Sequence, residues 1–184
     1  MAARGVFALT TFDRQSARFF NFSRSGLVTS FIAVLAVAGF ELAVSAALAQ
    51  TDMFEALVQT VIVYGALIAS TYLFARQIDR LDAMVPFIVT INWSNAALSL
   101  AMMVAVLVGL GFVAPVLMVA AIIVSINIAR LIMTLKALQI VLLILAQVVG
   151  LVAAVLVLAV LFPPTPEELA QIEQLQTELS SPQP

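Results

Sequence analysis

Residues 137–162 read ALQIVLLILAQVVGLVAAVLVLAVLF, a run with no charged side chain and only two strongly polar ones, Gln139 and Gln147. A helix needs about 20 consecutive, mostly apolar residues to cross a bilayer. This stretch is therefore predicted to be a transmembrane helix, and four similar runs precede it. Since the chain has 184 residues, of which 64% are hydrophobic and 10% are charged, five spans would leave no room for a soluble catalytic domain.

The predicted fold class is all-α: a polytopic membrane protein built as a bundle of about five transmembrane helices. Residues 1–26 are expected to form an interfacial segment rich in arginine and phenylalanine. Residues 163–184 form an acidic tail, in which a short amphipathic helix should begin after Pro163 and Pro164. The spans themselves are expected at residues 27–49, 54–75, 85–112, 115–135 and 137–162. The first span is too long for the apolar part of a signal peptide, about 7–15 residues, so we expect it to be retained.

The basic residues set the expected orientation of these spans. Every Lys and Arg falls before the first span, at a connection, or near the end of a span, and all of them can be placed on the same side of the membrane. Because short loops rich in Lys and Arg stay in the cytoplasm, the N-terminus is predicted to be cytoplasmic and the C-terminus periplasmic. The residues concerned are Arg4, Arg14, Arg18, Arg24, Arg76, Arg80, Arg130 and Lys136.

Both ends of the chain are amphipathic and are candidate contacts for lipid or for a protein partner. In residues 1–26, Leu9, Phe12, Phe19 and Phe20 fall roughly on one helical stripe. This pattern predicts a helix lying in the membrane interface, and the alternative is a disordered basic leader. The candidate contact residues are Phe12, Arg14, Arg18 and Phe19 at the N-terminus, and Ile172, Leu175 and Leu179 in the tail.

Small residues recur four positions apart in every span, for example Gly39, Ala43 and Ala47 in the first and Gly150 and Ala154 in the last. Such ladders let helix backbones approach closely, which favours association inside a bilayer. The ladders favour a compact bundle. They do not distinguish packing within the chain from packing against another protein.

Glu41 is an acidic residue expected deep inside the first span, and such a carboxyl group is protonated or has a partner. Tyr64 and Gln59 lie at a similar depth in the next span, so they are candidate hydrogen-bond donors to it. One interpretation is a proton or cation relay, or a contact to a partner protein. The other is a neutral carboxyl group hydrogen-bonded within the bundle.

A second polar cluster is predicted between the third and fourth spans. In an antiparallel hairpin, the polar faces of these two spans would meet as a seam open to the cytoplasm, with Asp79 or Asp82 neutralising Arg130. The seam could hold a lipid headgroup or a small polar ligand, or it could simply join the helices while Arg130 reaches the interface. Its residues are Asn92, Asn95, Ser99, Asn127, Arg130 and Thr134.

The chain contains no Cys and no His. Thiolate chemistry, histidine ligation of haem and the usual zinc ligands are therefore excluded. The remaining carboxylates are scattered on both sides of the membrane. We expect no cofactor, no metal site, no nucleic-acid partner and no enzymatic activity.

Two stretches, FSRSGLVTSFIA at residues 22–33 and FIVTINW at residues 87–93, resemble an uncharacterised Yip-like family of small five-span inner-membrane proteins of alphaproteobacteria. The resemblance implies a cytoplasmic N-terminus, a bacterial inner membrane and no catalytic residues. Yip-type proteins are regarded as organising membranes or binding partners. The resemblance therefore favours a scaffold over an enzyme.

Two functions are expected from these observations. The first is a non-catalytic scaffold or accessory subunit that packs against a larger membrane complex or against itself, or organises the membrane. The alternative is a small oligomeric transporter or channel, or a lipid-handling protein, that uses Glu41 and the polar seam. The lipid bilayer is a partner in either case.

Overall fold

The computed structural model describes residues 2–47 and 53–163, and the regular structure of these residues is entirely helical. Five helices in this part of the chain are long and apolar enough to cross a membrane, which confirms the predicted fold class. The chain is thus a multi-pass membrane protein. The five spans contain α2 (Arg24–Ala47), α3 (Met53–Gln77), α4 (Met84–Leu107), α5 (Ala114–Asn127) and α6 (Ala137–Leu161). Helix α5 is too short to cross by itself, and its span is Gly111–Ile132 because short helical turns extend it at both ends.

Shorter elements precede and connect these helices. Helix α1 (Ala2–Thr10) is followed by the 3₁₀ turn η1 (Ser16–Phe19). Two more 3₁₀ turns, η2 (Leu81–Ala83) and η3 (Gly111–Val113), lead into α4 and α5. Helix α5 continues as a π-helical turn, η4 (Ile128–Ile132). Such turns are rare, and they often lie at functional sites.

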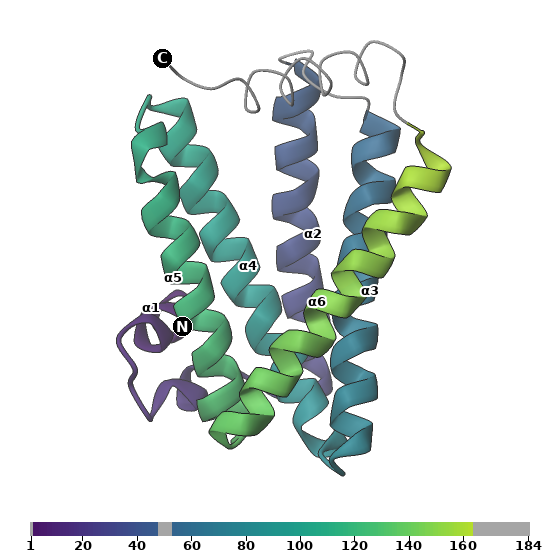
Figure 1. Cartoon of the computed structure of the whole chain (residues 1–184). Helices are drawn as coiled ribbons and strands as arrows, with labels where there is room; N and C mark the ends of the chain where they lie inside the picture. The colour runs from purple at the N-terminus through teal and green to yellow at the C-terminus, as the bar shows by residue number, and fades with distance from the viewer. Residues whose placement is uncertain (1, 48–52, 164–184) are drawn as a thin grey trace, which may run out of the picture.

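Helix α4 is the centre of the bundle, with 44% of its span buried against 6% for α2. The most extensive helix contacts join α2 to α4 and α3 to α6. Helix α6 crosses α3 obliquely, and the α3–α6 pair parts from α4 and α5 towards the upper end of Figure 1. The bundle is therefore closed at its lower end and splayed at its upper end.

The lower end is closed by large buried side chains. Phe74 of α3, Phe87 of α4, Leu143 of α6 and Met133, which follows η4, are all buried in one hydrophobic core. At the other end, Phe112 beside the α4–α5 turn is 76% exposed. The packing that holds the helices together is therefore concentrated at one end of the membrane.

Arg80 joins the α3–α4 connection to the connection that precedes α6, at the closed end of the bundle. Its Nη2 donates to the carbonyl oxygen of Met133 at 2.7 Å and to Oγ1 of Thr134 at 2.8 Å, and its Nε pairs with the Asp82 carboxylate at 3.4 Å. The expected pairing of Asp82 or Asp79 with Arg130 is not found. Asp82 forms its ion pair with Arg80 in the same loop, and Arg130 is exposed.

The N-terminal segment packs on the bundle instead of lying apart from it. Helix α1 contacts α4 and α5, and Leu9 is fully buried there. Nδ2 of Asn127 donates to the Leu9 carbonyl oxygen at 2.7 Å. The expected single stripe is broken because the chain turns at Phe12, where φ is +59°. Leu9 and Phe20 consequently point into the protein, and Phe12 points out.

The helix ends that carry Arg24, Arg76, Arg130 and Lys136 all lie at the lower end of Figure 1, as does the Arg80 loop. This arrangement agrees with the grouping of basic residues in the sequence. Which end faces the cytoplasm stays a prediction. The expected tail helix, with Ile172, Leu175 and Leu179, falls outside the described residues.

Candidate functional site

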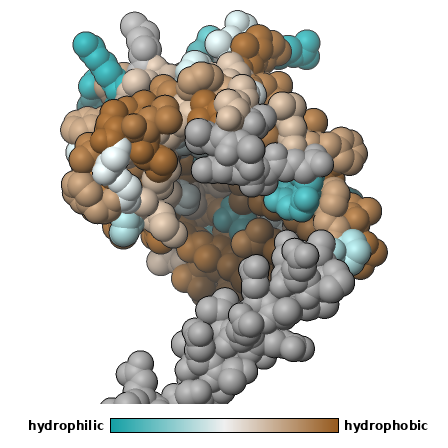
Figure 2. Space-filling model, turned by 90° about the horizontal axis from the view of Figure 1, so that it is seen from above, coloured by the Kyte–Doolittle hydropathy of each residue, from teal (hydrophilic) through white to brown (hydrophobic). Residues whose placement is uncertain are grey.

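A cleft of about 640 Å³ opens between α3, α4 and α6, where the two groups of helices part. Five polar side chains line it: Gln59, Thr60, Tyr64, Asn95 and Gln147. Its walls are aliphatic and come from Val63, Leu67, Ile144, Val148 and Leu151. Figure 2 looks into the hollow from above and shows hydrophilic atoms at its base between hydrophobic walls.

Helix periodicity places the polar groups of α3 in one column. Thr60, Tyr64 and Thr71 share a face because successive members are four and seven residues apart, which is close to one and two helical turns. From Gln59 to Thr71 the helix rises about 18 Å at 1.5 Å per residue. Polar groups thus extend from the splayed end of the bundle past the middle of α3.

Tyr64 belongs to a hydrogen-bond network that joins three helices. Its hydroxyl group donates to Oδ1 of Asn92 on α4. Nδ2 of Asn92 donates to Oγ of Ser30 on α2 at 3.1 Å, and Ser30 donates to the carbonyl oxygen of Leu27 at 2.7 Å. Asn92 and Ser30 are fully buried. The network therefore fixes α2, α3 and α4 behind the cleft.

A second bond fixes α6 against α3 deeper in the bundle. Nε2 of Gln147 donates to Oγ1 of Thr71 at 3.1 Å, and Thr71 donates to the Leu67 carbonyl oxygen at 2.8 Å. Above it, the helices approach closely at Gly150, where a Cβ atom would lie 3.0 Å from Cβ of Ser70. Gln147 thus presents its amide at the cleft while holding one wall in place.

The cleft narrows inward to a recess of about 140 Å³ that shares Leu67, Asn95, Ile144 and Gln147 with it. Phe87 and Leu143 of the hydrophobic core also line this recess. The cavity therefore ends against the packed end of the bundle, and it is open on one side of the protein.

The lining offers hydrogen bonds and no charge. No Asp, Glu, Lys or Arg is among the described residues that line the cleft. Its amides and hydroxyl groups both donate and accept hydrogen bonds. The described residues also contain no cluster of His, Cys, Asp or Glu that could hold a metal ion. The site suits an uncharged molecule with a small polar part and a hydrocarbon part.

The structure separates the residues of the first predicted site. Tyr64 and Gln59 both line the cleft, but Tyr64 donates to Asn92, and Nε2 of Gln59 donates to Oε1 of Glu55 at 2.9 Å. Glu41 is half-buried on α2 and is not among the cleft residues. Neither expected donor therefore bonds to Glu41.

The predicted seam between α4 and α5 is also divided. Asn92 turns towards α2 and α3, and Asn95 lines the cleft, whereas Asn127 donates to α1 and Thr134 accepts from Arg80. Ser99 is half-buried and Arg130 is exposed. The seam does not form because α1 packs across α4 and α5 and supplies the carbonyl group that Asn127 bonds.

Sequence reasoning missed Ser30, Thr71 and Gln147 as members of these networks. Gln147 carried a signal, because it is a polar residue in the middle of the most apolar span. Ser30 and Thr71 carried none, since Ser and Thr in a helix can bond to their own backbone. Both do so here, Ser30 to Leu27 and Thr71 to Leu67.

Comparison with known proteins finds no matching family model, no similar curated protein and no similar solved structure. The Yip-like resemblance therefore stays a prediction. The geometry of the cleft is what carries the functional argument.

Proposed function

We propose that this chain is a non-catalytic membrane protein that binds a small neutral amphiphile in the cleft between α3, α4 and α6. It is a lipid-handling protein in this proposal, with a hydroxyl or amide group of the ligand bonded by Tyr64, Asn95 and Gln147. The supporting observation is the uncharged polar lining inside the membrane-spanning bundle.

Size and chemistry agree with this role. Ligand pockets commonly enclose about 300–1,000 Å³ and combine apolar walls with a few placed polar groups. The cleft, at about 640 Å³, has this composition. A charged headgroup would find no counter-charge in the lining, so the ligand class is neutral lipids with a free hydroxyl or amide group.

Neighbouring residues of α6 provide a matched test. Val148 lines the cleft, whereas Val149 lines a separate apolar groove of about 620 Å³ between α3 and α6. Val148→Trp should fill the cleft, and Val149→Trp should leave it open. Both side chains are at least half exposed, so both variants should fold.

The probe is a photoactivatable dioleoylglycerol in nanodiscs, with crosslinked peptides mapped by mass spectrometry. Crosslinks should concentrate on the cleft residues and fall at least fivefold in Val148→Trp, but not in Val149→Trp. A photoactivatable phosphatidylcholine should show no such concentration. Equal crosslinking around every lipid-facing helix, or equal loss in both variants, would refute the proposal.

A scaffold role is a second candidate, and one observation favours it. On α2, Gly39 and Ala43 are exposed, and apart from the adjoining backbone of α2 no atom lies within 4 Å of a Cβ built at Gly39. Small residues of this kind suit close contact with a transmembrane helix of another protein. A cysteine crosslink from Ala43 to a co-purified membrane subunit, lost in Gly39→Leu, would support this role. A crosslink unaffected by Gly39→Leu would count against it.

A further inference from the structure

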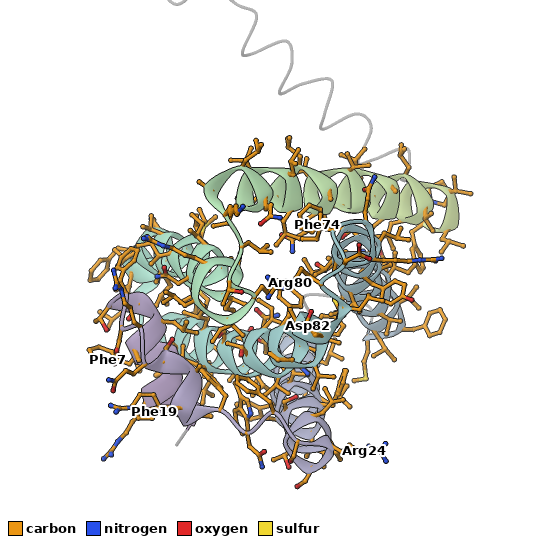
Figure 3. All side chains as sticks on the ribbon, turned by 90° about the horizontal axis from the view of Figure 1, so that it is seen from below. Phe7, Phe19, Arg24, Phe74, Arg80 and Asp82 are labelled. Atoms are coloured by element: carbon orange, nitrogen blue, oxygen red, sulfur yellow. The ribbon has the colours of Figure 1, made fainter. Side chains whose placement is uncertain are left out.

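The N-terminal segment has its own recess, far from the cleft. It has a volume of about 500 Å³ and is lined by residues of α1 and η1 and by the turn between them, among them Arg4, Phe7, Thr11, Asp13 and Phe19. Figure 3 shows Phe7 and Phe19 together at one edge of the molecule, away from Arg24. The proposed binding in the cleft does not use this surface, which combines exposed arginines and phenylalanines.

The charge of this surface is positive. Arg4, Arg14 and Arg18 are exposed, and Asp13 is the acidic residue among them. The carboxylate of Asp13 accepts from the backbone N–H of Gln15 at 2.8 Å. In residues 2–47 and 53–163, the ion pair within 4 Å is between Arg80 and Asp82. The three N-terminal guanidinium groups therefore keep their charge available for an external anion.

The exposed aromatic groups indicate that this basic surface meets a membrane surface. Phe7 is 70% exposed and Phe12 is 54% exposed, which suits insertion at the boundary of the acyl chains. The Arg18 guanidinium lies 4.8 Å from the centre of the Phe19 ring. That contact holds a cation beside the recess by a cation–π interaction.

The surface is also rigidly attached to the bundle. Val6 and Leu9 are buried, and Asn127 holds the Leu9 carbonyl group. Gly5 packs so closely that a Cβ atom there would lie 2.6 Å from the Phe20 ring. The backbone of α1 that carries Arg4 is therefore held in a fixed position beside α4 and α5.

We propose that Arg4 and Arg18, with Phe7 and Phe19, form a binding site for the phosphate headgroup of an anionic phospholipid in the leaflet at the closed end of the bundle. The arginines contact the phosphate group, and the phenylalanines lie beside the upper acyl chain. A lipid is favoured over a free anion because exposed phenylalanines flank the charges on a membrane-spanning protein.

The test is native mass spectrometry of lipid binding to the full chain in mild detergent, with dioleoyl phosphatidylglycerol or dioleoyl phosphatidylcholine as the probe. The test variant is Arg4→Gln with Arg18→Gln. The control is Arg24→Gln with Arg76→Gln, which removes the same charge from the same end of the bundle. All four arginines are exposed, so both proteins should keep the thermal unfolding temperature of the unmodified chain.

Phosphatidylglycerol should bind about 30-fold more weakly to the test variant, since each basic residue near an anionic surface contributes about 1 kcal/mol. The control should change less than about threefold, and phosphatidylcholine should be insensitive to both variants. A second variant, Ala3→Glu, adds a negative charge beside the recess and should weaken binding as well.

Three outcomes would overturn the proposal. Equal loss in the control would show general attraction to the basic end of the protein. Equal binding of phosphatidylcholine would remove the requirement for an anionic headgroup. Full competition by 10-fold excess inorganic phosphate over lipid, at about the ionic strength of the uncompeted sample, would show a free-anion site in place of a lipid site.

Discussion

Replacing Asn92 with leucine should separate helices that the buried network joins. The side chain accepts a hydrogen bond from Tyr64 and donates one to Ser30 at 3.1 Å. Hydrogen bonds between transmembrane helices average about 0.6 kcal/mol and reach about 1.7 kcal/mol. Loss of both bonds should lower the free energy of unfolding by about 1.2 kcal/mol, with a ceiling of about 3.4 kcal/mol.

Asn95→Leu is the matched control for this change. Asn95 lies one helical turn further along α4 and lines the cleft, and no hydrogen bond of its side chain is found within the described residues. Its replacement should change the free energy of unfolding by less than about 0.5 kcal/mol. The measurement is unfolding by sodium dodecyl sulfate in mixed micelles, followed by far-ultraviolet circular dichroism and compared at one detergent fraction.

A double-mutant cycle then isolates the bond between Tyr64 and Asn92. Tyr64→Phe removes the hydroxyl group, and combining it with Asn92→Leu should give a coupling energy of about 0.6 kcal/mol. The reasoning fails if Asn92→Leu costs no more than Asn95→Leu. It also fails if the coupling energy is zero within about 0.3 kcal/mol, because the three helices would then be held by apolar packing alone.

Gly150→Leu should destabilise the protein by about 1–3 kcal/mol through overpacking, since its Cβ would lie 3.0 Å from Cβ of Ser70. Gly39→Leu, with open space around it, should stay within about 0.5 kcal/mol; equal effects in the same detergent titration would contradict the α3–α6 packing. For orientation, the natural chain has no cysteine, so Leu110→Cys should react with an impermeant maleimide on intact cells and Lys136→Cys should not. The reverse labelling pattern would invert the predicted topology.

The five spans were predictable because the bilayer imposes one dominant requirement, a long apolar run. The predicted first span, residues 27–49, begins three residues after α2 does. The helix can begin at Arg24 because the long side chain reaches the membrane interface and keeps its charge in water. The partners of the polar residues were not predictable in the same way. A sequence gives the face on which Asn92 and Asn127 lie, but in helices that are apolar all round it does not say which helix that face meets.

The failure of the predicted seam shows this limit. Hairpin neighbours were expected to share their polar residues, so Asn92 and Asn127 were both assigned to the contact between α4 and α5. In the structure, the Asn92 side chain hydrogen-bonds to α2 and α3, and the Asn127 side chain hydrogen-bonds to α1. The nine-residue helix α1 decided the outcome, because it packs on α4 and α5 and its Leu9 carbonyl oxygen accepts the hydrogen bond of the buried Asn127 amide, as buried polar groups are normally hydrogen-bonded.

The position of the cleft also bears on whether the protein would carry the proposed ligand across the membrane. Polar lining occupies the half of the bundle where the helices part, while Phe74, Phe87 and Met133 fill the other half. Arg80 further joins the connections at the filled end. The proposed ligand would thus enter and leave on one side without breaking these contacts. Passage to the other side would require the aromatic core and the Arg80 bonds to open together, which a binding protein does not need and a transporter does.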